Sequence, residues 1–348
     1  MEIQRESIFI SALRGFCRSF FILLGIFAAF IVATFIYSSF TSPYQSQNKT
    51  TLEILPDLEW KSDFVSLSAP AILQINIHGV IGDPEKMDSE IVKSILVDSR
   101  SGLLAGDRVK GILLHFDTPG GTVTDSDNIY RLLLAYKEKY KVPIYGYVNG
   151  MCASGGMYIA SAADKLFCSP AGVVGSVGVI IGPFFNLYDT IGKLGIQAKT
   201  LTEGLDKDMM NPFRSWKPNE DESLKELIAY FYQQFVKVVT TGRPNLDRSK
   251  LINQYGANVF DGPSAQQFGY IDVAESSYPE ALAALMVDAG VDANKTYQIV
   301  QLKPEHHFLA DLMKGFSPLS NGKVEHQIHI GSDKTYAIRD RFAYLYQP

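Results

Sequence analysis

The stretch Val109-Lys-Gly-Ile-Leu-Leu-His-Phe-Asp-Thr-Pro-Gly-Gly121 decides the fold, because it is an apolar run that ends in a glycine turn. A short apolar run bounded by turn residues is typical of a buried strand. The residues after it, Asn128–Lys137, read as a helix, and Val142–Val148 reads as the next strand. We therefore predict a βαβ unit, with two parallel strands in an α/β sheet.

A second glycine-rich stretch, Gly150-Met-Cys-Ala-Ser-Gly-Gly-Met-Tyr-Ile-Ala160, follows the second strand and places Ser154 where a helix could begin. Small neighbours let a peptide backbone approach closely, and the unpaired N–H groups of a first helical turn favour an anion. Turns at the carboxyl ends of parallel strands share one rim of the sheet, so glycine N–H groups could face Ser154 as an oxyanion hole. The alternative is a turn that only caps a helix.

With these blocks in this order, the sequence resembles the signal peptide peptidase A family of membrane-anchored serine proteases. The resemblance runs from about Ile72 to Asp272. It implies an α/β domain with the Clp-protease/crotonase-like fold of repeated ββα units, preceded by one N-terminal transmembrane helix. The blocks that carry it are Pro119–Gly121, Ala153–Lys165, Gly175–Val179, Gly204–Pro212 and Phe260–Asp272.

The resemblance also implies the chemistry of the site. It makes Ser154 the nucleophile and Lys207 the general base, with the backbone N–H groups of Gly121 and Gly155 as oxyanion donors. Ser176 matches the serine that hydrogen-bonds the lysine in the family. In such a Ser/Lys dyad the neutral amine takes the serine proton, the serine attacks the peptide carbonyl, and water then hydrolyses the acyl-enzyme.

The lysine must be uncharged to act as a base, although a free lysine with a pKa near ~10.4 keeps its proton at neutral pH. Burial would remove the charge, whereas a neighbouring carboxylate would stabilise it. We therefore expect the flanking Asp206 and Asp208 to point away from the Lys207 amine. Judged from the residues alone, other lysines are comparable candidates for the base, namely Lys165, Lys193 and Lys199.

A Ser/His/Asp triad is the competing mechanism. Of the six histidines, His78 and His115 lie on predicted strands, and none lies between Ser154 and His306. In the Clp proteases the histidine follows the serine within a few tens of residues, so this spacing favours the dyad. The His306-His307 pair and three cysteines without Cys-x-x-Cys spacing make no zinc signature, and we expect no metal and no cofactor.

The amino-terminal segment predicts a membrane anchor. Ser19–Phe40 contains no charged residue and, at ~1.5 Å per residue, reaches about 33 Å, enough for a hydrocarbon core of roughly 30 Å. Three arginines precede it, and the next basic residue is Lys49. By the positive-inside rule, residues 1–18 stay in the cytoplasm and the rest is exported. We expect a single-pass protein of a bacterial inner (cytoplasmic) membrane; a cleaved signal peptide is the alternative.

The remaining chain divides by composition. Residues 41–68 read as a linker, residues 69–293 as the serine peptidase domain, and residues 294–348 as a C-terminal extension of unknown role, for which a strand, a packed tail or an assembly arm all fit. A net charge of −5 without a basic tract gives no reason to expect nucleic-acid binding. We expect Cys152 and Cys168 to be buried thiols, with a bridge between them left open.

We expect a membrane-anchored serine endopeptidase that hydrolyses cleaved signal peptides, and misfolded exported proteins too, with apolar stretches as its substrates. By the resemblance, a chain with one copy of the serine block assembles as a homo-oligomer, an octamer, in which Lys207 can meet Ser154 of a neighbouring subunit. One alternative is a non-catalytic membrane-tethered assembly protein, which a charged or outward-pointing Lys207 would favour. The other is thioester chemistry with coenzyme A, for which the sequence has no adenine-binding feature.

Overall fold

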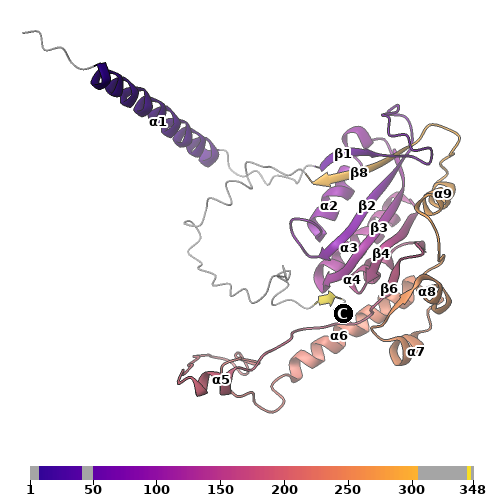
Figure 1. Ribbon diagram of the computed structural model, residues 1–348. Coiled ribbons are helices and arrows are strands. Elements are labelled where there is room, and N and C mark those ends of the chain that lie inside the picture. The colour runs from indigo at the N-terminus through magenta and orange to yellow at the C-terminus, as the bar shows by residue number, and fades with distance from the viewer. Residues whose placement is uncertain (1–7, 41–49, 305–342, 346–348) are drawn as a thin grey trace, which may run out of the picture. The chain divides into compact units, whose positions relative to one another are not determined.

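The computed structural model describes residues 8–40, 50–304 and 343–345, and the chain forms two compact units, residues 1–47 and 48–348 (Figure 1). The first unit contains helix α1 (Ile8–Phe40). Its span Ala12–Ala33 is 22 residues long, has a mean hydropathy of 2.3 and is not buried. It includes two arginines, residues with a high helix propensity, so the helix begins before the uncharged stretch that starts at Ser19. An apolar helix of this length fits a single-pass membrane protein.

The second unit is built on one mixed sheet of nine strands in the order β1-β8-β2-β3-β4-β6-β7, with β5 paired to β4 and β9 paired to β3. The central strands run parallel, whereas β1, β7 and β9 are antiparallel to their partners. The α/β class predicted from the sequence is confirmed. The strands are β1 (Thr50–Leu55), β2 (Ala71–Ile81), β3 (Val109–Thr122), β4 (Ile144–Ala153), β5 (Lys165–Cys168), β6 (Val173–Gly175), β7 (Val259–Asp261), β8 (Gln298–Pro304) and β9 (Ala343–Leu345).

The predicted βαβ unit is β3, helix α3 (Val123–Tyr140) and β4. Thr122 caps α3 by accepting a hydrogen bond from the Asp125 N–H, and the helix ends where Lys141 takes a left-handed conformation. The glycine turn that we expected after Phe116 is wrong in one respect, because β3 continues through Pro119 and both glycines. Pairing explains this: β2 stays beside β3 to the end, with Ile81 opposite Gly121.

Helices cover both faces of the sheet. The larger core lies under α2 (Ser89–Asp98), α3, α4 (Gly155–Ala160) and the carboxyl-terminal half of α6 (Glu222–Gly242). A smaller core lies on the other face, where α9 (Tyr278–Asp288) packs on β3 and β4. The remaining described helices are short: the 3-10 turn Gly102–Leu104, α5 (Tyr188–Lys193), α7 (Arg248–Lys250), the π turn Leu251–Tyr255 and α8 (Gly262–Phe268).

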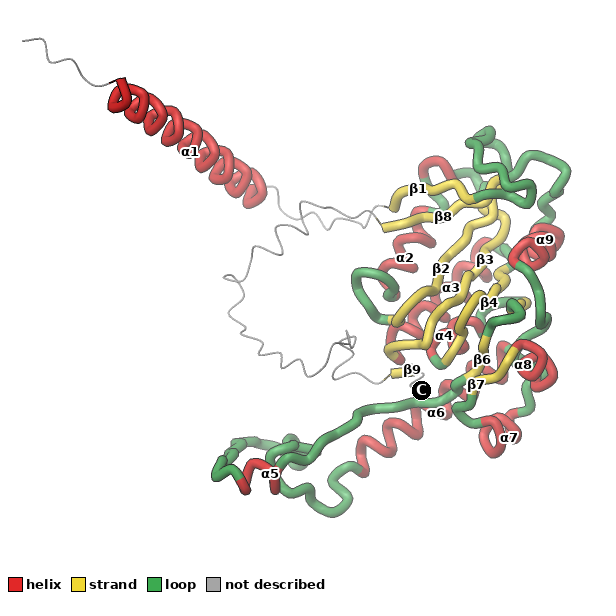
Figure 2. The backbone as a smooth tube through the Cα atoms, viewed as in Figure 1, coloured by secondary structure: helices red, strands yellow, loops and turns green. Residues whose placement is uncertain are grey.

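Between β6 and α6 the chain forms a long excursion, residues 180–221, which we call the arm. Figure 2 shows it extending away from the sheet, with α5 at its far end. The two legs are joined where the Leu187 N–H donates to the Pro212 carbonyl at 2.7 Å and the Asn186 amide donates to the Arg214 carbonyl at 3.0 Å. The arm exposes large apolar side chains: Ile180, Phe184, Phe185, Leu187, Tyr188, Leu194, Ile196, Leu201, Leu205 and Phe213.

The apolar stripe of α6 is only half buried. Phe235, Val236 and Val239 pack into the core, whereas Leu227 and Tyr230 on the amino-terminal half are exposed. The arm and this half of α6 together present a continuous run of chain whose apolar side chains the described residues do not cover. Exposed apolar side chains gathered in one segment are typical of an interaction site.

Candidate active site

Ser154 occupies a sharp turn between β4 and α4. Its φ of 53° and ψ of −115° lie in a region that non-glycine residues rarely adopt, at a cost of roughly 1–3 kcal/mol. The turn is held by its backbone: the Ser154 N–H donates to the Gly175 carbonyl at 2.9 Å, and the Ser154 carbonyl accepts from the Tyr158 N–H at 3.0 Å. The sequence placed Ser154 where a helix begins, and α4 begins at Gly155.

The Ser154 hydroxyl is buried and unpartnered. The residue is 1% exposed, and its Oγ has no hydrogen-bond partner among the residues that the structure describes. Buried hydroxyl groups are nearly always hydrogen-bonded, so an orphaned one needs an explanation. A strained turn that holds a buried oxygen without a partner is a combination typical of a reactive group.

Gly121 and Gly155 belong to the two glycine-rich stretches, Pro119–Gly121 and Ala153–Lys165. Both are buried, Gly121 near the end of β3 and Gly155 at the first position of α4. A Cβ on Gly121 would overlap the Ile81 carbonyl, so only glycine lets β2 and β3 stay this close. A Cβ on Gly156 would lie 2.6 Å from the Thr118 methyl group, which shows how tightly α4 packs on β3.

Thr118 joins these parts, and sequence reasoning missed it. Its Oγ1 donates to the Gly79 carbonyl at 2.5 Å and accepts from the Gly120 N–H at 3.0 Å, and the residue pairs with Cys152 of β4. The side chain is fully buried. One hydroxyl therefore fixes the ends of β2 and β3 beside the turn of Ser154. A threonine directly before Pro-Gly-Gly was the available signal.

A short strand lies on the edge of β3 next to this turn. After Thr118 the strand β3 is no longer paired with β4, and β9 takes the free edge, with Ala343, Tyr344 and Leu345 opposite Thr122, Gly121 and Gly120. The backbone of β9 also lies against α3 and α4 (Figure 2). The edge at Gly121 thus accepts an extended chain in the antiparallel direction. These three residues of the C-terminal extension form a strand.

Ser176 and Lys207 are placed differently from each other. Ser176 directly follows β6, is 4% exposed, has a φ of 56° and donates its N–H to the Asn258 carbonyl at 2.7 Å. Lys207 lies in the arm and is exposed. It makes no hydrogen bond to the Ser154 Oγ, which has no partner among the described residues. Within one chain the structure brings Ser154, Gly121 and Gly155 to one rim of the sheet and leaves Lys207 outside it.

The histidines of β2 and β3 pair with each other instead of with Ser154. His78 Nε2 and His115 Nδ1 are 2.7 Å apart, and the His115 ring packs against Tyr147 and Tyr278. Burial and the nearby His78 lower the pKa of His115 to about 4, against a smaller opposing effect of Asp117. Neither is a triad partner of Ser154. The other four histidines lie outside the described residues.

Metal and disulfide sites are absent from the described part of the chain. It contains no group of three or more His, Cys, Asp or Glu side chains placed to hold a metal ion. Its three cysteines, including the buried Cys152 and Cys168, are free thiols. Burial raises the pKa of the Cys168 thiol to about 11, so it behaves as a small apolar residue.

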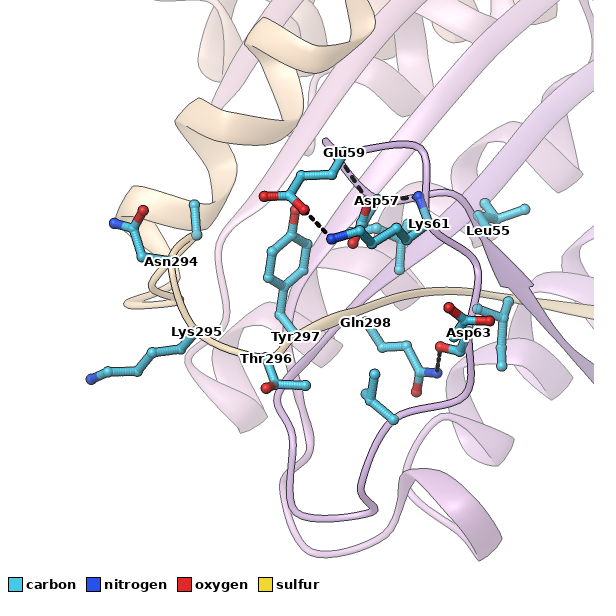
Figure 3. Close-up of a pocket in the computed structure, with 14 residues that line it drawn as sticks. Leu55, Asp57, Glu59, Lys61, Asp63, Asn294, Lys295, Thr296, Tyr297 and Gln298 are labelled. Carbon is cyan, nitrogen blue, oxygen red and sulfur yellow. Dashed lines mark hydrogen bonds and ion pairs between the residues drawn. The ribbon is translucent and has the colours of Figure 1, made fainter.

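The hollow in Figure 3 lies beside the start of β8, at the amino-terminal ends of the parallel strands, whereas Ser154 follows the carboxyl end of β4. It has a volume of about 390 Å³ and lies between the loop after β1 and the segment before β8. Its polar groups are used locally: Asp57 accepts from the Glu59 and Lys61 N–H groups, Lys61 pairs with Glu59, and Tyr297 accepts from the Leu58 N–H at 3.1 Å. These bonds stabilise the loop.

Several relatives by sequence are named as proteases or peptidases, and two are named sodium/proton antiporters of Brucella. A putative signal peptide peptidase SppA of Enterococcus faecium is 31% identical over 207 residues, which cover 58% of this chain and 59% of the relative. A putative protease of Synechocystis is 36% identical over 161 residues, covering 46% and 57%. The chloroplastic serine protease SPPA of Arabidopsis thaliana is 25% identical over 241 residues, covering 69% and 35%. The chain thus spans less than three fifths of the length of these relatives.

Solved structures align weakly. A membrane-bound stomatin-specific protease aligns with a TM-score of 0.41 and 15% identity over 69% of this chain and 100% of that one. A variant of ClpP1 from Listeria monocytogenes aligns with a TM-score of 0.39 and 15% identity, over 59% and 92%. The α/β class of the domain follows from its own sheet topology.

The family model named Peptidase family S49 matches residues 136–292. The match begins near the end of α3 and includes Ser154, Ser176, the arm with Lys207, and α6 to α9. Its limits therefore enclose the strained serine turn and every predicted site residue except Gly121. Residues 136–292 of this chain are thus similar in sequence to peptidase family S49.

Proposed function

We propose that this protein is a membrane-anchored serine endopeptidase in which Ser154 is the nucleophile and Lys207 the general base. The observation that carries the proposal is the Ser154 Oγ itself, which is buried, has no partner in the described part of the chain, and lies on a strained turn beside a strand edge that holds an extended chain. The S49 match supports protease chemistry. A hydroxyl without a partner is free to receive a substrate carbonyl on one side and a base on the other.

Peptide substrate binds as a strand on the edge of β3 at Gly120–Thr122, in the place that β9 takes. Main-chain hydrogen bonds supply the affinity in this mode of recognition, and side chains supply the preference. The scissile carbonyl then points its oxygen at the N–H groups of Gly121 and Gly155, which stabilise the developing negative charge.

The reaction follows as two transfers. Lys207 takes the proton of Ser154 as Oγ attacks the carbonyl carbon, and the tetrahedral intermediate collapses when the protonated lysine gives that proton to the leaving amine. Lys207 next takes a proton from water as the water oxygen attacks the ester carbon, and it returns that proton to the Ser154 Oγ when the ester C–O bond breaks and the acid leaves. Ser176, buried beside the turn, holds the lysine amine in line.

A second copy of the chain completes the site. Within one chain Lys207 is exposed and the Ser154 Oγ has no partner among the described residues, while the arm that carries Lys207 is lined with exposed apolar side chains. We propose a homo-oligomer, an octamer as the family resemblance implies, in which the arm of one subunit packs on its neighbour. Docking removes water from the lysine amine, which disfavours its charged form.

The membrane anchor determines which peptides the peptidase domain can reach. Helix α1 anchors the chain in a bacterial cytoplasmic membrane, with residues 1–18 in the cytoplasm and the peptidase domain outside. Relatives named signal peptide peptidase and serine protease support apolar peptides as the substrate class. Cleaved signal peptides are such peptides and lie in the same membrane, and apolar segments of misfolded exported proteins fit the same edge.

The exposure of Lys207 within one chain favours a second candidate, a membrane-tethered assembly protein without catalytic activity. The test is cleavage of a fluorogenic, leucine- and alanine-rich peptide by the detergent-solubilised full chain. We expect Ser154→Ala, Lys207→Ala and the double variant each to lose about a thousandfold or more, without additivity, because the two residues act as one unit. Wild-type protein that assembles but cleaves nothing would establish the second candidate.

A further inference from the structure

One arginine, Arg214, holds the segment of the arm that carries Lys207 through hydrogen bonds to Asp208. Arg214 Nε and Asp208 Oδ2 are 2.8 Å apart, and Arg214 Nη2 lies 3.1 Å from Asp208 Oδ1, so the guanidinium holds the carboxylate at both oxygens. The same Nη2 donates to the Asp208 backbone carbonyl at 2.8 Å. Paired hydrogen bonds of this kind fix direction as well as distance, which a lysine in place of the arginine could not do.

A second carboxylate completes the cluster. Arg214 Nη2 lies 2.7 Å from Glu220 Oε2, and Glu220 Oε1 accepts from the Met210 N–H at 3.3 Å. The Glu220 side chain is 3% exposed, and those of Arg214 and Asp208 are 23% and 20% exposed. Charged side chains on a projecting arm are normally solvated, so the partial burial of these three indicates that they form a specific ion-pair cluster. Residues 208–210 are thereby held from two sides.

The cluster determines which cation pairs with the carboxylate of Asp208, the residue next to Lys207. Asp208 follows Lys207 directly in the chain, and its carboxylate would pair with any cation in reach. Arg214 takes that carboxylate and holds the pKa of both Asp208 and Glu220 below their ordinary values. Lys217 acts weakly on Asp208. Along the chain, Asp206 directly precedes Lys207, and Asp221, which follows Glu220, pairs with Lys225.

We propose that Arg214 is a positioning residue for Lys207: by binding the Asp208 carboxylate it keeps that carboxylate from pairing with the lysine amine. The inference rests on the proposed function, in which Lys207 must lose its proton to act. A lysine next to an unpaired aspartate would keep its proton to higher pH. Arg214 acts through Asp208 and does not itself touch the reacting atoms.

The test compares pH–rate profiles of kcat/KM for the assembled full-length protein. Arg214→Gln should move the acid limb of the profile to higher pH by about one unit, so that activity near neutral pH falls about tenfold and recovers at high pH. Arg214→Gln combined with Asp208→Asn should return the limb toward the wild-type position, because the competing carboxylate is then gone. A merely structural role would lower activity equally at every pH.

Two controls make the result decisive. Lys217→Gln removes a cation from the same segment without removing a hydrogen bond to Asp208, so the acid limb of its pH–rate profile should stay at the wild-type position. Arg214→Lys should shift the acid limb by less than Arg214→Gln does. An unmoved limb in Arg214→Gln, or a moved limb that Asp208→Asn does not restore, overturns the inference alone. A wild-type profile without an acid limb, or one that survives Lys207→Ala, overturns the proposed function and the inference with it.

Discussion

Gly121 and Tyr344 face each other across an antiparallel pair of strands, on the edge that β3 exposes once its pairing with β4 has ended at Thr118. The chain thus places its own backbone where the proposed substrate binds, beside the turn of Ser154. An edge that pairs with one extended segment pairs with others, because the hydrogen bonds involve only main-chain groups.

Deleting residues 343–348 should free this edge. We expect KM for a fluorogenic peptide to fall about three- to tenfold with kcat nearly unchanged, since the competent fraction of sites rises while the chemistry stays the same. Steady-state kinetics of the solubilised protein measure both constants. Deleting residues 346–348 alone leaves β9 in the chain and is the matched control; equal KM values for all three proteins would contradict competition at this edge.

Thr118→Val should damage catalysis by releasing the end of β3. The variant keeps the shape of the side chain but leaves the Gly79 carbonyl and the Gly120 N–H without the hydroxyl they share. Unpaired buried groups cost roughly 1–3 kcal/mol each, so the strand end should shift and kcat should fall about ten- to a hundredfold.

Thr118→Ser retains the hydroxyl and is the matched variant for that measurement. It should keep kcat within about threefold of wild type. Thermal unfolding of both variants separates lost stability from lost activity. Equal kcat values for the valine and serine variants would show that the hydroxyl does not position Gly121.

Mixed oligomers test whether two chains share one site. Co-expressed Ser154→Ala and Lys207→Ala chains, purified through different tags, should regain about one quarter of the wild-type activity, because one site in four then combines an intact serine with a neighbour's intact lysine. Each variant alone should be inactive. A mixture no more active than its separate components would place both residues of the dyad in the same chain.

The paired histidines of β2 and β3 predict a pH effect on stability. Burial lowers the pKa of both, that of His115 to about 4, so the folded protein holds them neutral at a pH where the unfolded chain, with histidine near ~6.5, takes up protons. Stability should therefore be full above about pH 6.5 and decline toward about pH 4. Unfolding by denaturant at several pH values measures the slope, and His115→Gln should make it shallower by about one proton. An unchanged slope would contradict this assignment.

Local patterns in the sequence predicted the local structure well. The apolar run from Val109, the helix after it and the small residues around Ser154 specify strand, helix and turn within short windows, and the structure confirms each. The pairing of β3 through Gly121 was missed, because glycines signal a turn and the partners of this segment, Ile81 and Tyr344, lie far away in sequence.

The arm escaped prediction for a related reason. Its apolar residues have no single period, and the described residues do not cover them, so neither its projection nor the exposure of Lys207 follows from spacing. The contact of Arg214 was not predicted either, because an arginine six residues after an aspartate is unremarkable in the sequence. Only the fold brings the Arg214 Nε within 2.8 Å of the Asp208 Oδ2. The roles of Ser154, Lys207, Gly121, Gly155 and Ser176 remain predictions carried by the resemblance.

Covalent labelling of Ser154 tests the central claim most directly. The assembled full-length protein is treated with a fluorophosphonate, digested and analysed by mass spectrometry. We expect one adduct, on the peptide that contains Ser154, and a labelling rate that falls at least about a hundredfold in Lys207→Ala, because the unassisted hydroxyl is a poor nucleophile. No adduct on Ser154 in the assembled wild-type protein, or labelling that Lys207→Ala leaves unchanged, would contradict a Ser/Lys peptidase.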